Sequence, residues 1–294
     1  MKKILAVAVA TAISAPAMAD LTIGASTEFN LSTTDGVASE SIETNVTFTG
    51  STTMENGSFA KAFIELEAVD GGDASTALDI DDNYLQIGNA AANVVVGYFG
   101  TKSAFISGDD SFEAGVVTTR GINEVSTTSP ENLYKGNSDD DADDQEIALN
   151  ITSIEGVDLQ VSGNINDASD TDMRAYAGLT VGGIALAANI QSSDTPETDG
   201  YALSATTDLA GATVSVSYAT NDVDDSATEL TANMNGFDVT YVRFEDGAAN
   251  TSETSYYGSY ALGNMGIDGL SVDVGAGSGS DRETKMGVEV IYSF

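Results

Sequence analysis

The segment at residues 286–294 limits which folds this chain can adopt, because its side chains alternate in kind. Every second position is apolar: Met286, Val288, Val290, Tyr292 and Phe294. The positions between them are polar or small, with Ile291 as the exception. Since successive side chains of a strand point to opposite faces, one face is apolar and ends in two aromatic rings. An apolar outer face and a polar inner face are typical of strands in a membrane β-barrel.

The same period of two recurs from Leu21 onward. The clearest apolar parity consists of Ala60, Ala62, Ile64, Leu66 and Ala68. Lys61, Glu65 and Glu67 occupy the other parity of this segment. Such a pattern predicts a wall with lipid on one side and a water-filled lumen on the other.

The predicted fold class is an all-β, antiparallel transmembrane barrel of about 16 strands. The predicted strands are residues 21–32, 41–53, 58–69, 82–89, 93–99, 145–153, 157–166, 172–182, 184–192, 200–208, 212–220, 227–235, 237–245, 253–262, 269–276 and 284–294. A different division of one hairpin gives about 14 or 18 strands. A soluble sandwich is the main alternative fold.

The connections between these segments alternate between short and long, which favours the barrel. The short connections are residues 55–57, 89–91, 155–156, 182–183, 210–211, 235–236 and 263–266. The long, acidic connections lie around Asp35 and at residues 70–82, 100–144, 167–172, 193–199, 221–225, 245–253 and 277–283. A barrel has short periplasmic turns on one rim and long extracellular loops on the other, whereas a sandwich mixes its loop lengths.

The connection at residues 100–144 is the longest, at 45 residues. Loops of this length are uncommon in compact folds and are usually functional. Its first two-thirds contain Phe105, Ile106, Phe112, Val116, Val117 and Ile122. These side chains favour a loop that folds into the lumen and narrows it, as a constriction loop. The alternative is a disordered extracellular insertion.

The N-terminal residues predict export. Lys2 and Lys3 precede a mostly apolar run at residues 4–13, and Ala17-Met18-Ala19 fits the small-residue cleavage rule. We therefore expect a cleaved signal peptide at residues 1–19 and a barrel at residues 20–294. A membrane anchor is the alternative, but the apolar run is too short to span a bilayer as a helix.

Charge and composition exclude several functions. The chain carries 46 acidic and 10 basic residues, for a formal net charge of −36. Such a surface repels nucleic acid, so we expect no nucleic-acid partner. The chain has no Cys and no His. Outer-membrane lipases and proteases use a histidine as the general base. Because this chain has none, we expect no enzymatic activity.

These features together resemble the general porins of Gram-negative bacteria, nearest in style to those of marine and photosynthetic alphaproteobacteria. The local likeness runs from Asn83-Tyr84-Leu85-Gln86-Ile87-Gly88 to Val94-Val95-Val96-Gly97, and Ser111-Phe112-Glu113-Ala114-Gly115 is similar to the acidic tip of the family's third loop. Tyr98 stands where the family often has a wall arginine. The resemblance implies a homotrimer of water-filled channels in outer-membrane lipid, each narrowed by an acidic third loop that faces a basic patch. It also implies that Tyr292 and Phe294 form an assembly signal.

In a pore, charge placement and radius determine function. The basic candidates for the constriction are Lys61, Arg174 and Lys285, which share the parity expected to face the lumen. The acidic candidates on the long loop are Asp109, Asp110, Glu113, Glu124 and Glu131. The alternatives are ordinary salt bridges for the basic residues and a solvated loop face for the acidic ones. Arg243 shares the apolar parity of its strand and should face outward or reach the rim.

The acidic run near the end of the long loop is a weak candidate for divalent cations. It consists of Asp139, Asp140, Asp141, Asp143 and Asp144. Carboxylates suit Ca²⁺, but the run lacks the glycine of an EF-hand loop, so a solvated loop is the simpler interpretation. We expect no other cofactor. The remaining functional alternatives are a substrate-specific channel, which requires a run of aromatic side chains along the lumen, and a surface protein without a pore.

Overall fold

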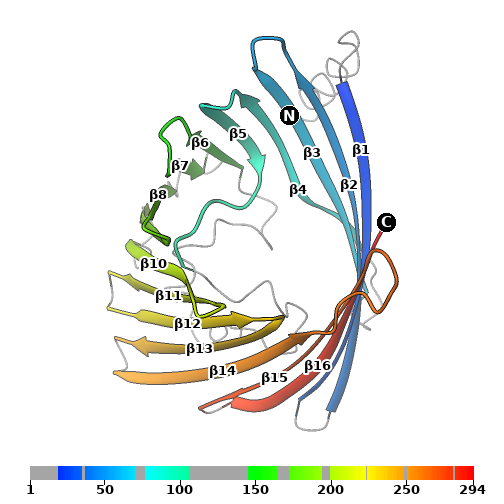
Figure 1. The fold of residues 1–294 in the computed structure, drawn as a ribbon, viewed down its shortest axis with the longest axis vertical. Helices are drawn as coiled ribbons and strands as arrows, with labels where there is room; N and C mark the ends of the chain where they lie inside the picture. The colour runs from blue at the N-terminus through cyan, green and yellow to red at the C-terminus, as the bar shows by residue number, and fades with distance from the viewer. Residues whose placement is uncertain are drawn as a thin grey trace.

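The computed structural model describes residues 19–34, 37–70, 77–105, 145–164, 172–193, 199–222, 224–247, 250–280 and 282–294. These residues form a closed barrel of antiparallel strands (Figure 1). The strands are β1 (Ala19–Thr34), β2 (Val37–Thr53), β3 (Phe59–Asp70), β4 (Ala77–Gly88), β5 (Ala92–Tyr98), β6 (Glu146–Ile151), β7 (Val157–Asn164), β8 (Asp172–Val181), β9 (Ile184–Ser193), β10 (Gly200–Leu209), β11 (Ala212–Asn221), β12 (Ser226–Met234), β13 (Phe237–Asp246), β14 (Thr251–Ala261), β15 (Leu270–Gly279) and β16 (Arg282–Ser293). Each strand pairs with its neighbours in the chain, and β1 pairs with β16. The predicted barrel of 16 strands is confirmed.

The last residue takes part in closing the barrel. The backbone N–H of Phe294 donates to the carbonyl oxygen of Ala25 at 2.9 Å, and the N–H of Ala25 donates to the carbonyl oxygen of Phe294 at 3.1 Å. On the other side of β16, the N–H of Ser293 donates to the carbonyl oxygen of Gly269 at 2.8 Å. A Cβ at Gly269 would lie 2.1 Å from the carbonyl oxygen of Ser293, so only glycine allows this close approach. The end of β16 is therefore held on both edges.

The predicted alternation of faces is found in the strands. On β1, Leu21 and Ile23 are exposed on the outer face, whereas Asn30 and Ser32 are 2% and 4% exposed on the inner face. Ile64 and Leu66 of β3 lie in register with Phe48 and Val46 of β2, and Phe48 lies in register with Ile23, so this parity also faces outward. The outer surface of the barrel is therefore apolar, as contact with lipid requires.

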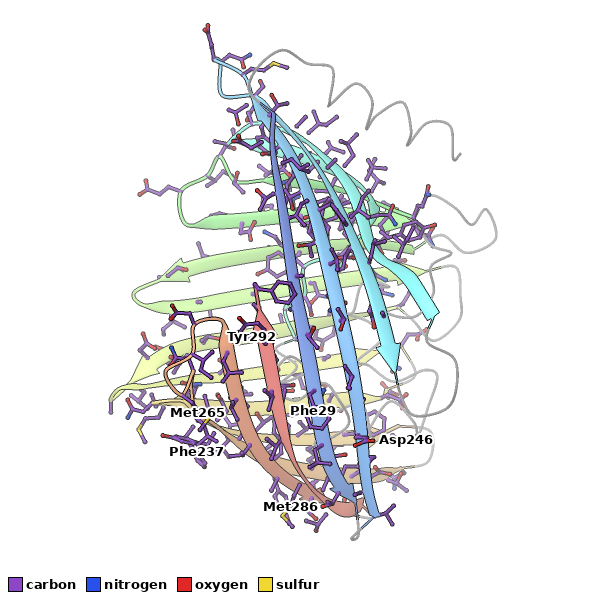
Figure 2. All side chains as sticks on the ribbon, turned by 90° about the vertical axis from the view of Figure 1, so that its right-hand side faces the viewer. Phe29, Phe237, Asp246, Met265, Met286 and Tyr292 are labelled. Carbon is purple, nitrogen blue, oxygen red and sulfur yellow. The ribbon has the colours of Figure 1, made fainter. Side chains whose placement is uncertain are left out.

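The connections alternate less regularly than predicted, because some strands continue into segments expected to be loops. Two residues separate β1 from β2 and β15 from β16, where long connections were predicted, whereas eight residues separate β14 from β15, where a short one was predicted. Three short connections place two consecutive residues at positive φ, as type I′ hairpin turns require: Gly182-Gly183, Ala210-Gly211 and Asn235-Gly236. In Figure 2, Met265 in the β14–β15 connection and Asp246 at the end of β13 lie at opposite rims. Within the described residues, no helix is long and apolar enough to cross a membrane.

The wall is shortest where the longest connection begins. β1 and β2 contain 16 and 17 residues, whereas β5 and β6 contain 7 and 6. Figure 1 shows the segment that follows β5 leaving the wall and running through the interior of the ring toward β10. The short strands therefore let the chain enter the lumen at this point of the wall.

Candidate functional site: the narrowed lumen

Residues 99–105, which we call the loop base, lie inside the barrel. The backbone N–H of Lys102 donates to Oε1 of Gln160 on β7 at 2.7 Å, and the N–H of Ala104 donates to Oδ1 of Asn189 on β9 at 2.9 Å. Both acceptors are inner-face side chains that are less than a tenth exposed. The loop base is therefore fastened to the lumen wall by its own backbone, as the predicted inward fold requires.

The end of the loop base packs into an apolar site formed by Ala202, Ala219 and Ala227, which we call the apolar seat. Ala104 and Phe105 are 0% and 6% exposed and pack against Ala202, Ala219 and Ala227 on β10, β11 and β12. Alanines at these inner-face positions leave room for a phenylalanine ring that larger side chains would exclude. Burying such a ring stabilises the arrangement by roughly 1.5–3 kcal/mol. The loop base thus reaches from β7 to β12, across a large part of the lumen wall.

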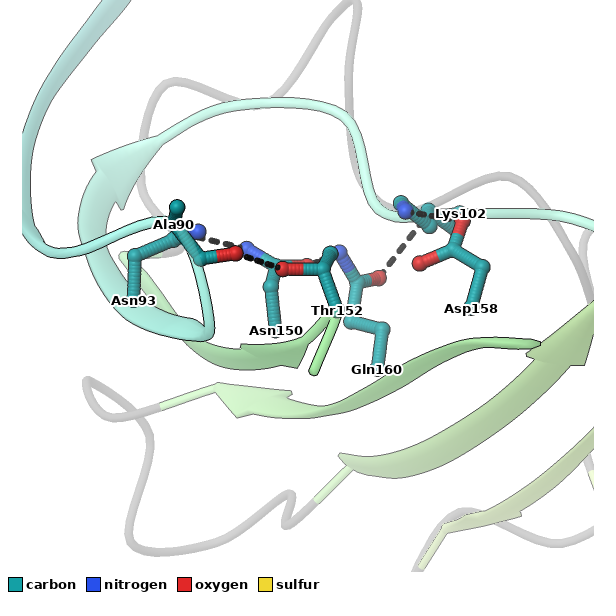
Figure 3. Close-up of polar contacts among 7 residues, drawn as sticks. All are labelled: Ala90, Asn93, Lys102, Asn150, Thr152, Asp158 and Gln160. Atoms are coloured by element: carbon teal, nitrogen blue, oxygen red, sulfur yellow. Dashed lines mark hydrogen bonds and ion pairs between the residues drawn. The ribbon is translucent and has the colours of Figure 1, made fainter. Parts of the chain in front are cut away.

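A ladder of amide side chains connects the loop base to the wall (Figure 3). Nδ2 of Asn150 on β6 donates to Oδ1 of Asn93 on β5 at 2.9 Å. Nε2 of Gln160 on β7 donates to Oδ1 of Asn150 at 2.9 Å, and Oε1 of Gln160 then accepts the bond from Lys102. A ladder whose groups are satisfied in this way is rigid. It therefore fixes the height at which the chain crosses the lumen.

Lys102 is a site residue that sequence reasoning missed. Its Nζ forms a salt bridge and hydrogen bond with Oδ2 of Asp158 on β7 (Figure 3). The same Nζ lies 5.8 Å from the ring centroid of Tyr176 on β8. Asp158 precedes Gln160 on the inner parity of β7, which is the one sequence signal for this contact. Because both side chains are more than a third exposed, the pair contributes at most about 1 kcal/mol. The pair therefore contributes little to the stability of the barrel, and its main consequence is that it places two charged groups on the channel side of the wall.

Arg174 lies on the inner face of β8, as its parity predicts. It is 9% exposed and pairs with the 3% exposed Glu146 of β6 at 2.9 Å. Its Nε donates to Oε1 of Gln191 at 3.1 Å, and its Nη1 donates to Oγ1 of Thr101 in the loop base at 3.1 Å. These contacts match the alternative of an ordinary salt bridge within the lumen. Arg174 therefore ties the loop base to the wall, and its constriction role stays a prediction.

Lys61 and Lys285 lie far from Arg174 around the ring. Lys61 is near the short-turn end of β3, where its Nζ donates to the hydroxyl of Tyr84 at 3.0 Å. Lys285 is near the long-loop end of β16, in register with Gly277 and Thr34. The three predicted basic residues belong to β3, β8 and β16 and do not form one patch. The described wall thus departs from the basic patch that the family resemblance implies.

Sequence reasoning also missed an aromatic cluster on the inner face of β3–β5. The rings of Phe63 and Tyr84 are stacked at 5.1 Å, and Phe99 meets Tyr84 edge-on at 6.1 Å. Nζ of Lys61 lies 5.3 Å from the centroid of Tyr84. Phe99 is the first residue of the loop base and is 6% exposed, so the loop base begins packed against the ring of Tyr84. The cluster therefore acts as wall packing rather than as an open track of rings.

Two groups of predicted site residues lie outside the described residues. They are the loop acids Asp109, Asp110, Glu113, Glu124 and Glu131, and the acidic run Asp139, Asp140, Asp141, Asp143 and Asp144. Both groups stay predictions. In the part of the chain that the structure describes, no three acidic side chains are grouped closely enough to hold a metal ion. Arg243 faces outward as expected, half exposed and paired with Glu245 at 2.5 Å.

The comparisons with known proteins agree with this architecture. A family model described as Gram-negative porin matches residues 6–294. A mutant of the Rh. blastica porin is 19% identical, with a TM-score of 0.67, and the match covers 94% of this chain and 100% of that one. A triple mutant of the Rhodopseudomonas blastica porin is 18% identical over the same shares, also with a TM-score of 0.67. At these identities the solved structures show a shared fold alone. No curated protein matches the chain.

Proposed function

Because this chain belongs to the Gram-negative porin family, we propose that it forms a water-filled channel through which ions and small hydrophilic solutes cross the outer membrane by passive diffusion. One observation carries the proposal: the backbone of the loop base is fastened across the inside of a closed barrel. A barrel of 16 strands is too wide for side chains to fill, so an inward loop narrows it without sealing it. Function then depends on the charges that line the narrowed part.

Cation preference is the finer part of the proposal. The chain carries 46 acidic residues against 10 basic ones. Of the basic residues described in the lumen, Arg174 and Lys102 are paired with carboxylates. A negative lumen concentrates cations and repels anions, and added salt screens the effect beyond about 8 Å. We therefore expect cations to permeate more readily than anions at low ionic strength.

Export and assembly complete the proposal. The basic, apolar and small-residue sequence of residues 1–19 supports a cleaved signal peptide. The strand register that closes β1 on β16 supports a role for Phe294 in assembly, because its backbone is part of that closure. We expect a homotrimer, as in the general porins that the chain resembles, with outer-membrane lipid around the apolar outer face. Binding of divalent cations by Asp139, Asp140, Asp141, Asp143 and Asp144 stays a prediction.

Swelling of liposomes tests the proposal. Vesicles that contain the purified, folded protein are placed in isotonic solutions of neutral sugars of increasing mass. A passive channel predicts swelling rates that fall smoothly with solute size and do not saturate with concentration. Fast, saturable uptake of one sugar would instead support the substrate-specific alternative. Folded protein that admits no solute would contradict the channel, and heat-unfolded protein is the control.

A further inference from the structure

The part of the lumen wall opposite the loop base is acidic. The strand register places six carboxylates on the inner face: Glu28, Glu43, Glu65, Glu67, Asp273 and Glu289. We call this set the acidic wall. It lies on β1–β3, β15 and β16, and β1 is as far from β9 in the ring as two strands can be. Since the loop base is seated on β7–β12, the acidic wall faces it across the lumen. The basic side chains described on the same strands' inner face are Lys61 and Lys285.

The acidic wall contains two pairs of direct register partners, Glu28 with Glu43 and Asp273 with Glu289. Glu28 of β1 and Glu43 of β2 are register partners near the middle of their strands. Like charges at directly opposite positions of a strand pair repel each other. Nδ2 of Asn30 donates to Oε1 of Glu28 at 2.5 Å, and Nδ2 of Asn45 donates to Oε1 of Glu43 at 2.7 Å. These amides are neutral, and neither carboxylate forms an ion pair among the described residues.

Beside Glu28 and Glu43, two buried amide oxygens accept no hydrogen bond within the described structure. Asn30 is 2% exposed and lies in register between Ser41 and Glu289, yet its buried Oδ1 accepts no hydrogen bond within the described structure. Oδ1 of Asn45, in register with Glu67, is likewise buried without a partner. A buried acceptor without a donor costs roughly 1–3 kcal/mol. Two neighbouring carboxylates and two amide oxygens without donors therefore lie together. A cation bound there would reduce the repulsion between the carboxylates and could be coordinated by the amide oxygens.

We propose that Glu28 and Glu43, with the amide oxygens of Asn30 and Asn45, form a cation-binding station on the lumen wall that determines ion selectivity. No three carboxylates among the described residues are close enough to replace the water around a metal ion. The cation therefore keeps much of its hydration and binds weakly, as conduction requires. This inference rests on the proposed channel function and deepens it, because it assigns part of the preference to the wall opposite the loop.

A paired comparison of double variants tests the station. Glu28→Gln with Glu43→Gln removes both charges and keeps side-chain size. The control, Glu55→Gln with Asp268→Asn, removes the same charge from exposed positions in the β2–β3 and β14–β15 connections. Reversal potentials are measured in planar bilayers across a KCl gradient. The ratio of K⁺ to Cl⁻ permeability should fall roughly two- to fivefold in the station variant and stay near the wild-type value in the control.

Two outcomes distinguish an error in the proposed cation-binding station from an error in the proposed channel function. A cation-preferring wild type whose station variant keeps the same permeability ratio would overturn the station and leave the channel intact. A folded wild type without conductance would overturn the proposed function itself. The single variant Glu43→Gln, with an intermediate ratio, replaces the double variant if the latter does not fold. As a second measurement, wild-type conductance should saturate at high KCl, whereas that of the station variant should rise more nearly linearly.

Discussion

Oδ1 of Asn189 on β9 accepts a hydrogen bond of 2.9 Å from the backbone N–H of Ala104, a residue that precedes it by 85 positions. Both residues are buried, at 3% and 0% exposure. The bond connects the backbone of the loop base directly to the lumen wall. Since a backbone N–H cannot move without its segment, this contact fixes where the chain crosses the channel.

Replacing Asn189 should therefore loosen the loop base. Asn189→Ala leaves the buried N–H of Ala104 without an acceptor, at a cost of roughly 1–3 kcal/mol. We expect larger and noisier single-channel currents, because the loop samples more than one position. Asn233→Ala is the matched control, since it removes an exposed hydrogen bond to Asp238 beside a short turn. Currents as steady as those of the wild type from Asn189→Ala would show that the apolar seat alone holds the loop base.

Arg174 should matter more for stability than Lys102. Arg174→Met removes the buried ion pair with Glu146, and breaking a buried pair costs about 3–5 kcal/mol. Lys102→Met breaks a half-exposed pair that contributes at most about 1 kcal/mol. The thermal unfolding midpoint in detergent should therefore drop clearly for the first variant and little for the second. Equal drops would contradict the difference in burial.

Phe294 should act through its ring as well as through its backbone. The ring is 72% exposed and lies 5.8 Å from that of Tyr292, so it adds little to packing. Phe294→Ala keeps the two backbone bonds to Ala25, whereas deletion of Phe294 removes them. If the ring is an assembly signal, both changes should sharply lower the amount of heat-modifiable barrel in the outer membrane, and Phe294→Ala should still refold in detergent. Wild-type amounts in cells from Phe294→Ala would rule out the signal.

The loop acids should contribute to selectivity according to their place in the loop. Neutralising Asp109, Asp110 and Glu113 together should reduce the cation preference more than neutralising residues 139–141. The reason is that the first group follows the loop base, whereas we expect the second to lie at the solvated end. Reversal potentials of the two triple variants in the same salt gradient measure the difference. Equal effects would mean that the first group does not line the constriction.

Local patterns predicted the barrel because a strand repeats every two residues. The alternation around Ile64 and Leu66 was enough to assign the outer face, and the parity of Arg174 was enough to place it in the lumen. The alternation of connection lengths was only partly right, because β1 and β2, and β15 and β16, continue to within two residues of each other. Each of these features depends on residues that are close in sequence.

The contacts that build the site could not be predicted in the same way, because they depend on the register between distant segments. Nothing near Lys102 indicates that Asp158 lies beside it. The neighbouring charges of Glu28 and Glu43 appear only when β1 is aligned with β2. The basic patch implied by the resemblance stays a prediction, because Lys61, Arg174 and Lys285 have luminal parity but lie on different parts of the ring.

Single-channel recording in planar bilayers tests the central claim most directly. Purified, heat-modifiable protein added to one side of a bilayer in KCl should produce discrete current steps. The current in each open step should vary linearly with small applied voltages, and in a salt gradient the reversal potential should have the sign of a cation-preferring channel. Folded barrel that inserts without any current steps would contradict the claim that this protein is a water-filled channel.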